Sequence, residues 1–360
     1  MMTRTVAEKA RRRLVLLGLL APLAASCGGR GDADGPGPSM SPLADAAETI
    51  TSEDMMARIG VLAHDSMRGR DTPSPGLEMA ARYIVEEFQR MGLEGAAGEG
   101  EFIQRYPFPP SADTAAGAAG RASAPNVVAL LRGSDPELAD EYIVFSAHMD
   151  HVGVGRPDET GDSIYNGADD DASGTAALIE VAEAFTNLLQ RPRRSLLFLA
   201  VSGEEKGLLG SRWFSDHPTV PLENMVANIN VDMIGRNAPD TIVVIGQEYS
   251  SLGPTVHAVA DARAELGLEV ALDPWPEERF FFRSDHFNFA RKEIPALFFF
   301  AGVHEDYHEP SDEVHLIDGD KAARVARLIF YTAHELADTP ARPTWTEQGL
   351  AEIRALVGNR

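Results

Sequence analysis

Apolar positions along the chain fall into blocks with two different periodicities. Residues 75–91 carry apolar side chains at helical spacing, with Ser74 as a capping residue, Pro75 in the first turn and Gly92 at the end. Residues 196–201 instead form a short continuous apolar run, which is typical of a strand buried on both faces. The chain therefore combines amphipathic helices with fully buried strands.

The same patterns predict alternating strands and helices over most of the chain. Further strands are expected at 127–131, 142–147, 225–231, 241–246 and 296–301. Further helices are expected at 44–64, 173–189, 207–216, 251–266, 319–337 and in a terminal segment where Thr344 and Glu347 have capping-box spacing. Residues 110–124 are expected to form a loop. This order predicts an α/β fold, a single domain with a central, mostly parallel mixed sheet flanked by helices on both faces.

The first 27 residues depart from this pattern. A basic stretch precedes an apolar run at 14–25 that is too short to span a bilayer comfortably, and small residues then lead to Cys27, the only cysteine of the chain. We expect residues 1–26 to be an export signal. A lone cysteine in this place resembles the lipobox of bacterial lipoproteins, which implies lipidation at Cys27 and a flexible tether over 27–43. Plain secretion is the alternative.

These expectations place the folded domain, 44–360, in the bacterial cell envelope, on the periplasmic or extracellular face. The net charge of -23 argues against a nucleic-acid partner and against a basic membrane-binding face. Membrane contact would then come through the lipid anchor alone. The sequence carries no signal for an oligomeric state.

Side chains with metal-binding chemistry follow the predicted strands. His148, the pair Glu204 and Glu205, and Asp232 each come after the end of a different apolar strand. In open α/β sheets, ligands bind at the carboxyl ends of the strands, so these residues are expected at one edge. A histidine with several carboxylates and no cysteine suits Zn²⁺, with Mn²⁺ or Co²⁺ as alternatives.

An acidic turn adds to this set. Asp169, Asp170 and Asp171 are adjacent in a Gly/Ala-rich segment that leads into the helix expected from Ser173. Adjacent carboxylates repel one another unless a cation or solvent intervenes. A solvated acidic loop is the simpler interpretation of the turn alone. Beside the strand-end residues, we favour a metal-binding turn.

Five segments together resemble the M28 family of co-catalytic zinc aminopeptidases. They read SAHMDH at 146–151, NGADDDASG at 166–174, GEEKGLLGS at 203–211, NVDMIG at 230–235 and YHEPSD at 307–312. The helix expected after Arg68-Gly69-Arg70 also resembles the family's usual entry segment, and the similarity covers roughly 55–338. The resemblance implies a zinc-exopeptidase fold of the phosphorylase/hydrolase type. Residues 93–141 leave too little room for the protease-associated insertion that many members carry.

The resemblance also implies roles for individual residues. The ligands of two Zn²⁺ ions would be His148 and Asp232 for one ion, Glu205 and His308 for the other, and Asp170 as the bridge. In similar proteins the bond corresponding to Asp170–Asp171 is cis. Glu204 would act as general base for a water shared by the metals and would pass its proton to the departing amine. Asp150 would orient the imidazole of His148.

The implied activity is removal of N-terminal amino acids from peptides. Tyr307 would either stabilise the oxyanion or serve only in packing. Alternatives are a glutaminyl cyclase with one zinc, a carboxypeptidase or dipeptidase that would need basic residues in its pocket, and a non-catalytic binding ectodomain. His151, His286 and His315 are interpreted as structural. Phe280–Phe282 would line an apolar pocket or pack in the core, and Arg283 and Asp285 receive no role.

Overall fold

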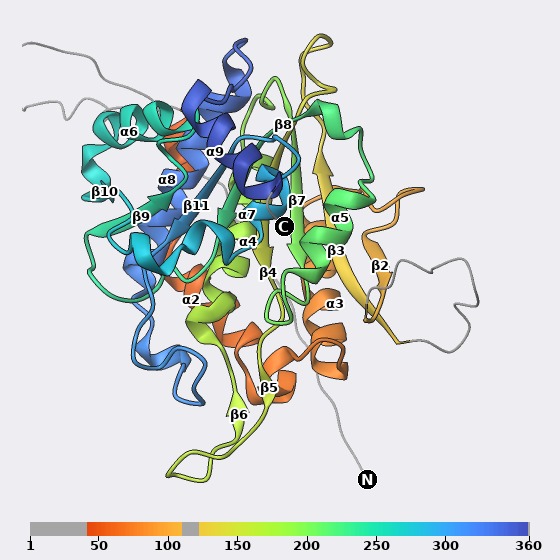
Figure 1. Cartoon of the computed structure of the whole chain (residues 1–360), viewed down its shortest axis with the longest axis vertical. Helices are drawn as coiled ribbons and strands as arrows, with labels where there is room; N and C mark the ends of the chain where they lie inside the picture. The colour runs from red at the N-terminus through yellow and green to blue at the C-terminus, as the bar shows by residue number, and fades with distance from the viewer. Residues whose placement is uncertain (1–41, 110–121, 359–360) are drawn as a thin grey trace, which may run out of the picture. The chain divides into compact units, whose positions relative to one another are not determined.

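The computed structural model describes residues 42–109 and 122–358, and its central feature is a mixed sheet (Figure 1). The strands lie in the order β1-β3-β7-β4-β8-β11-β9-β10, and β2 also pairs with β3. Their bounds are Glu94–Gly95 (β1), Ile103–Pro107 (β2), Ser123–Leu131 (β3), Tyr142–His148 (β4), Ser195–Val201 (β7), Met225–Val231 (β8), Thr241–Ile245 (β9), Glu269–Ala271 (β10) and Ala296–Phe300 (β11). A separate hairpin consists of Gly153–Val154 (β5) and Ile164–Tyr165 (β6).

The middle of the sheet is parallel. Strands β7, β4, β8 and β11 run in the same direction, while antiparallel pairs join β3 to β7 and β9 to β11. Every residue of β4, β7 and β8 is buried. This confirms the α/β fold and the expectation that 196–201 is covered on both faces.

Helices cover both faces of the sheet. Their bounds are Pro42–Ala47 (α1), Ser52–Leu62 (α2), Pro75–Arg90 (α3), Gly174–Thr186 (α4), Leu209–Asp216 (α5), Leu252–Ala262 (α6), His286–Ala290 (α7), Gly319–Asp338 (α8) and Glu347–Gly358 (α9). Successive residues of a strand face opposite sides. In β7, Phe198 joins the core formed with α3, α4 and α8, whereas Leu197 and Leu199 pack with Phe214 of α5 and Phe289 of α7.

Three expected elements differ from the structure. The helix expected at 44–64 is divided into α1 and α2, because Thr51 caps α2 by accepting a hydrogen bond from the main-chain N–H of Asp54. Strand β3 already begins at Ser123, inside the expected loop. The terminal helix is capped by Thr346, which accepts from the N–H of Gly349 at 2.9 Å, and Thr344 does not cap it.

The predicted signal, the lipidation site Cys27 and most of the tether lie outside the described residues. Helix α1 begins at Pro42, so the last two residues of the expected tether are helical. Within residues 42–109 and 122–358, none of the helices combines the length and apolarity that a bilayer crossing requires.

Candidate metal centre

The carboxyl ends of three neighbouring strands bring the candidate residues together. Strands β7, β4 and β8 are adjacent and parallel, so their ends meet at one edge of the sheet. His148 is the last residue of β4, and Asp232 directly follows β8. Gly203 turns the chain after β7 with φ of 71°, and a Cβ there would lie 2.7 Å from the hydroxyl of Tyr106. This turn leads to Glu204 and Glu205.

The acidic turn is buried. It forms the irregular helical turn η2 (Ala168–Ser173) before α4, and its Asp170–Asp171 peptide bond is cis, as the family resemblance implied. Asp169 accepts from the N–H of Gly235, and Asp171 accepts from the N–H groups of His148 and Gly174. These carboxylates hold the main chain in place. The solvated-loop interpretation is therefore wrong, since all three side chains are shielded from water.

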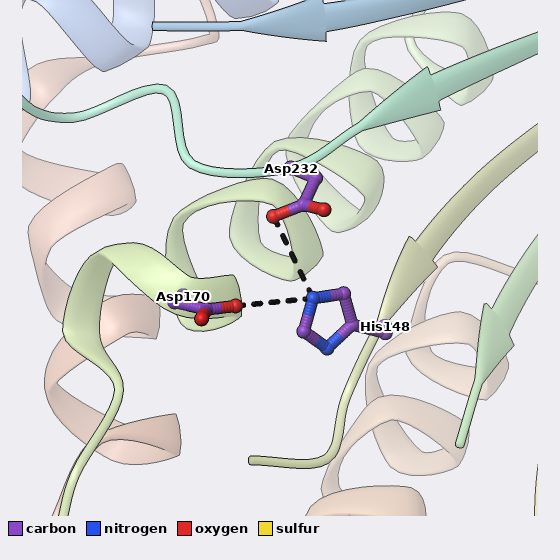
Figure 2. Close-up of side chains that lie close together, drawn as sticks. All are labelled: His148, Asp170 and Asp232. Atoms are coloured by element: carbon purple, nitrogen blue, oxygen red, sulfur yellow. Dashed lines mark ion pairs between the residues drawn. The ribbon is translucent and has the colours of Figure 1, made fainter. Parts of the chain in front are cut away.

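A first cluster forms around His148 (Figure 2). Its Nε2 atom lies 3.2 Å from Oδ1 of Asp170 and 3.5 Å from Oδ1 of Asp232. The other oxygen of Asp232 accepts a hydrogen bond of 2.8 Å from Ser284. Oδ1 of Asp232 is buried and has no hydrogen-bond partner among the described residues. The three side chains come from β4, η2 and the end of β8, and their ligand atoms are close enough to share one cation.

A second cluster uses the other oxygen of Asp170. Nε2 of His308 lies 3.1 Å from Oδ2 of Asp170 and 3.0 Å from Oε2 of Glu205. The main chain of His308 has φ of 59°, a left-handed conformation that is uncommon outside glycine and frequent at functional sites. Asp170 thus presents one carboxylate oxygen to each cluster.

His151 also lies at the second cluster. Its ring is fully buried, and Nδ1 lies 2.8 Å from Oε1 of Glu205 and 3.8 Å from Oδ2 of Asp170. The sequence alone predicts a structural role for this residue. The only signal for a site role was its position, three residues after His148 in the segment leaving β4.

Burial and neighbouring charges shift the pKa values of the carboxylates and histidines in the two clusters. Burial raises the pKa of Glu204 well above its usual range, and the nearby carboxylates of Asp285, Glu205 and Asp232 act in the same direction. Burial also works against ionisation of Asp170, but hydrogen bonding to His148 and His308 holds its pKa well below the usual range. Burial disfavours a charged His308, yet Asp170 and Glu205 raise its pKa to about 10. Without a metal, protonated histidines compensate the carboxylates.

This donor set fits divalent cations. Imidazole nitrogens and carboxylate oxygens are the ligands that zinc takes in proteins when cysteine is absent. Oδ1 of Asp232, Oε1 of Glu205 and Nε2 of His308 are buried and lack hydrogen-bond partners within the described part of the chain. Unsatisfied buried polar atoms are rare and costly unless something else binds them. Metal binding would displace the protons that the histidines hold.

Asp150 contacts His148 through its main chain more closely than through its side chain. Nδ1 of His148 lies 3.1 Å from the main-chain oxygen of Asp150 and 3.8 Å from its carboxylate. The carboxylate instead accepts from the hydroxyl of Thr72 at 2.9 Å and from the N–H of Glu204 at 3.3 Å. Asp150 therefore positions the imidazole through its main chain, and its side chain holds the turn that carries Glu204.

Two supporting residues received no role from the sequence. Arg70 is fully buried and donates to the carbonyl groups of Met149, Asn166 and Gly167 at 2.7–3.0 Å. The carboxylate of Asp312 accepts from the N–H groups of Asp169 and Asp170, each at 3.1 Å. Arg70 and Asp312 lie in segments that carry the family resemblance, but only their contacts show that they fix the acidic turn.

A pocket with an aromatic wall opens beside the first cluster. His148, Asp170, Glu204 and Asp232 line one side, and Met233, Phe280, Phe298, Phe300, Val303, Arg283 and Tyr307 line the rest. The ring of Tyr307 stacks on His308 with centroids 3.9 Å apart. Of the three adjacent phenylalanines, Phe280 lines the pocket, whereas Phe281 packs in the core. Pocket lining therefore applies to Phe280, and core packing applies to Phe281.

His286 does not reach the clusters. It is fully buried, stacks on Phe298 with centroids 4.7 Å apart and meets Phe281 edge to face. His315 lies on the surface in the turn η7 (Val314–Leu316). The structural interpretation of these two histidines agrees with their positions.

The burial of His286 has a consequence for stability. Desolvation lowers the pKa of His286 to about 3, below the usual 6.5, so the folded protein holds the ring neutral. The unfolded chain binds a proton below pH 6.5, and stability is lost as the pH falls toward the folded pKa. At about 1.4 kcal/mol per pH unit, this group removes about 2 kcal/mol between pH 6.5 and pH 5. His286→Phe should remove that part of the pH dependence.

The measurement is urea unfolding at several pH values between 7 and 5. Wild type should lose more stability over this range than His286→Phe. His315→Phe, the same substitution at an exposed position, should follow the wild-type profile. Parallel profiles for wild type and His286→Phe would contradict the prediction.

A protein family and several curated proteins are similar to this chain in sequence. Residues 126–333 match the family described as "Peptidase family M28". A "Probable zinc metalloprotease" of Pyricularia oryzae is 27% identical over 331 residues, which cover 78% of this chain and 62% of the relative. Another "Probable zinc metalloprotease", of Pyrenophora tritici-repentis, is 28% identical, with coverage of 61% and 58%. This chain therefore spans less than two thirds of either relative.

Solved structures share the fold. An aminopeptidase from Aneurinibacillus sp. strain AM-1 aligns with a TM-score of 0.63 at 18% identity, covering 83% of this chain and 97% of that one. The Legionella pneumophila LapA aminopeptidase aligns with a TM-score of 0.62 at 21% identity, covering 82% and 75%. At these identities the likeness establishes the arrangement of the sheet and helices.

Proposed function

The chain belongs to peptidase family M28, and we propose that it removes N-terminal amino acids from peptides with a pair of zinc ions. The observation that carries the proposal is Asp170, whose two oxygens face two different sets of ligand atoms. A carboxylate placed in this way is suited to bridge two cations. The names of the relatives, "Probable zinc metalloprotease", support zinc as the metal. Mn²⁺ or Co²⁺ would fit the same donors.

In this proposal each cluster holds one ion. His148 and Asp232 bind one zinc, Glu205 and His308 bind the other, and Asp170 bridges them. A bound zinc pair lowers the pKa of a shared water and polarises the scissile carbonyl group. Ser284 fixes Asp232 by its hydrogen bond, and Asp150 fixes the ring of His148 through its main-chain oxygen.

Glu204 is the proposed general base. It lines the pocket next to His148, Asp170 and Asp232, and none of the ion-binding clusters requires its carboxylate. Its raised pKa is useful for accepting a proton from water and returning it to the departing amine. The buried carboxylates around it set that pKa, and bound cations would offset their effect.

Tyr307 is the proposed oxyanion donor. It lines the same pocket, and burial raises its pKa above the usual 10, with Asp170 and Glu205 adding to the shift. A tyrosine with a raised pKa stays protonated and can donate a hydrogen bond to a developing negative charge. Its stacking on His308 holds the ring beside the second cluster.

The aromatic wall supports an apolar N-terminal side chain as the preferred substrate group. Phe280, Phe298 and Phe300 line the pocket. The names of the structural neighbours, which are aminopeptidases, support N-terminal cleavage.

Arg283 favours a second candidate function, a dipeptidase. Arg283 lines the pocket, and its guanidinium lies over the ring of Phe280 and 3.1 Å from Glu278. A dipeptidase requires a cation of this kind for the substrate's C-terminal carboxylate.

One experiment tests the proposal and separates the two candidates. The purified chain is assayed on Leu-arylamide, N-acetyl-Leu-arylamide, a Leu-containing dipeptide and a longer peptide, with and without a chelator. We expect hydrolysis of the first, third and fourth, no hydrolysis of the acetylated substrate, and loss of activity on zinc removal with recovery on zinc addition. Activity that survives complete zinc removal would reject the proposal. Cleavage of the dipeptide alone would favour the dipeptidase.

The cellular setting remains part of the proposal. We propose export through residues 1–26 and a lipid anchor at Cys27, which would place the peptidase domain in the bacterial cell envelope. The support is the sequence of that segment. Its substrates would then be extracytoplasmic peptides.

A further inference from the structure

We infer that His151 is a fourth protein ligand of the second metal position, together with Asp170, Glu205 and His308. This inference rests on the proposed function, because it presumes that a metal ion binds there. It extends the ligand set implied by the family resemblance, which contains five residues and leaves His151 out.

The contact between His151 and Glu205 has the length of a ligand-to-ligand contact. Their atoms Nδ1 and Oε1 lie 2.8 Å apart, yet neither has a hydrogen-bond partner with suitable geometry among the described residues. Two ligand atoms at about 2.0–2.2 Å from one zinc lie about 2.8–3.6 Å from each other at angles between 90° and the tetrahedral value. The contacts of His308 with Asp170 and Glu205, at 3.1 and 3.0 Å, fall in the same range, whereas Nδ1 of His151 lies 3.8 Å from Oδ2 of Asp170, which corresponds to a wider angle at the metal.

The ring of His151 is fixed in this orientation. It is fully buried and lies against Gly167, where a Cβ atom would come within 2.5 Å of its Cγ. Gly167 has φ of 57°, and its carbonyl accepts from Arg70, so the backbone on that side is held. The N–H of His151 donates to the carbonyl of Arg70 at 3.4 Å. A second ring, that of His308, meets His151 edge to face at 5.6 Å.

The ring nitrogens of His151 remain without hydrogen bonds. Both Nδ1 and Nε2 are buried and unpartnered within the described part of the chain. Leaving a buried polar atom without a partner is unfavourable for the folded state. A cation bound between His151, Asp170 and Glu205 would remove this cost at Nδ1, since the three ligand atoms all lie within 4.8 Å of one another.

A fourth ligand would make the two metal positions unequal. The first position has three protein ligands and would keep an open place for water or substrate, as catalytic zinc sites do. The second would have four, the number typical of zinc sites with a structural role. The second ion would therefore be retained more firmly, and the scissile carbonyl would approach the first.

The test compares zinc binding in wild type, His151→Phe and His304→Phe. The wild-type protein is crystallised with zinc, and zinc release to a chelator is followed for all three. We expect a bond of about 2.0–2.1 Å from Nδ1 of His151 to the second zinc. In His151→Phe one of two zinc ions should be released at least about 10-fold faster, since even outer-shell substitutions weaken metal binding 10–100-fold. His304, a buried histidine beside Asp169, serves as matched control, and its variant should release zinc as wild type does.

The outcomes separate the inference from the function it rests on. Two bound zinc ions with His151 outside bonding distance would overturn the inference and leave the proposed function standing. Unchanged release in His151→Phe would do the same. A wild-type protein that binds no zinc would overturn both. The crystal structure of the wild type decides the question even where His151→Phe does not fold.

Discussion

Glu204→Gln is expected to lower kcat by about 10²–10⁴-fold while both zinc ions stay bound. General acid–base catalysis contributes rate factors of this size, and glutamine has nearly the shape of glutamate but cannot accept the proton. Glu204 lines the pocket, and the ion-binding clusters are formed by other residues. The effect should fall on kcat more than on KM, because the substrate's contacts with the pocket wall are unchanged.

The measurement pairs steady-state kinetics with the zinc content of each variant. The adjacent substitution Glu205→Gln should behave differently, since Glu205 contacts His308 and His151 and its loss should release zinc. Glu137→Gln, an exposed position, should leave both quantities unchanged. If Glu204→Gln keeps full turnover, Glu204 is not the base. If it loses zinc as Glu205→Gln does, its role is in metal binding.

The central strands of the sheet could be predicted because their signal is local. A strand buried on both faces, such as 196–201, must be a continuous apolar run, and the order of runs and amphipathic segments gives the fold class. Helix boundaries that depend on a single side-chain hydrogen bond could not be predicted. Thr51 and Thr346 cap helices, but many threonines have the same local sequence features, and only the folded chain shows which accept a main-chain N–H.

In the site, too, some residues could be predicted from local sequence patterns and others depend on the folded chain. His148 and Asp232 were predictable because parallel neighbouring strands bring their ends to one edge. The choice of Asp170 among three adjacent aspartates depended on resemblance, and the structure gives a physical reason, since Asp169 and Asp171 are occupied by main-chain N–H groups. The sequence predicts a structural role for His151, because it is a spare histidine outside the five expected ligands. Its approach to Glu205 depends on the path of two loops, which no periodicity encodes.

Asp170→Ala should have the largest effect on metal binding, because this one side chain takes part in both clusters. Its removal takes one ligand from each ion and leaves the remaining carboxylates without a bridge. We expect both zinc affinities to fall by more than about 100-fold, beyond the 10–100-fold typical of changes to residues that only support a ligand. Activity at limiting zinc should be lost, and no variant of a residue in one cluster alone should weaken both ions equally.

The neighbouring aspartate provides the matched control. Asp169 is equally buried and lies in the same turn, but its Oδ1 accepts from the N–H of Gly235 and its Oδ2 lies 3.3 Å from His304. Asp169→Ala should therefore lower the free energy of unfolding while keeping two zinc ions per chain, as measured by calorimetric titration with zinc and by urea unfolding of the loaded protein. Asp170→Ala should instead lose both zinc ions, and with them the stability that bound ions give the folded protein. Retention of both ions in Asp170→Ala would mean that the two clusters do not share a ligand, and the two-zinc arrangement would then be wrong.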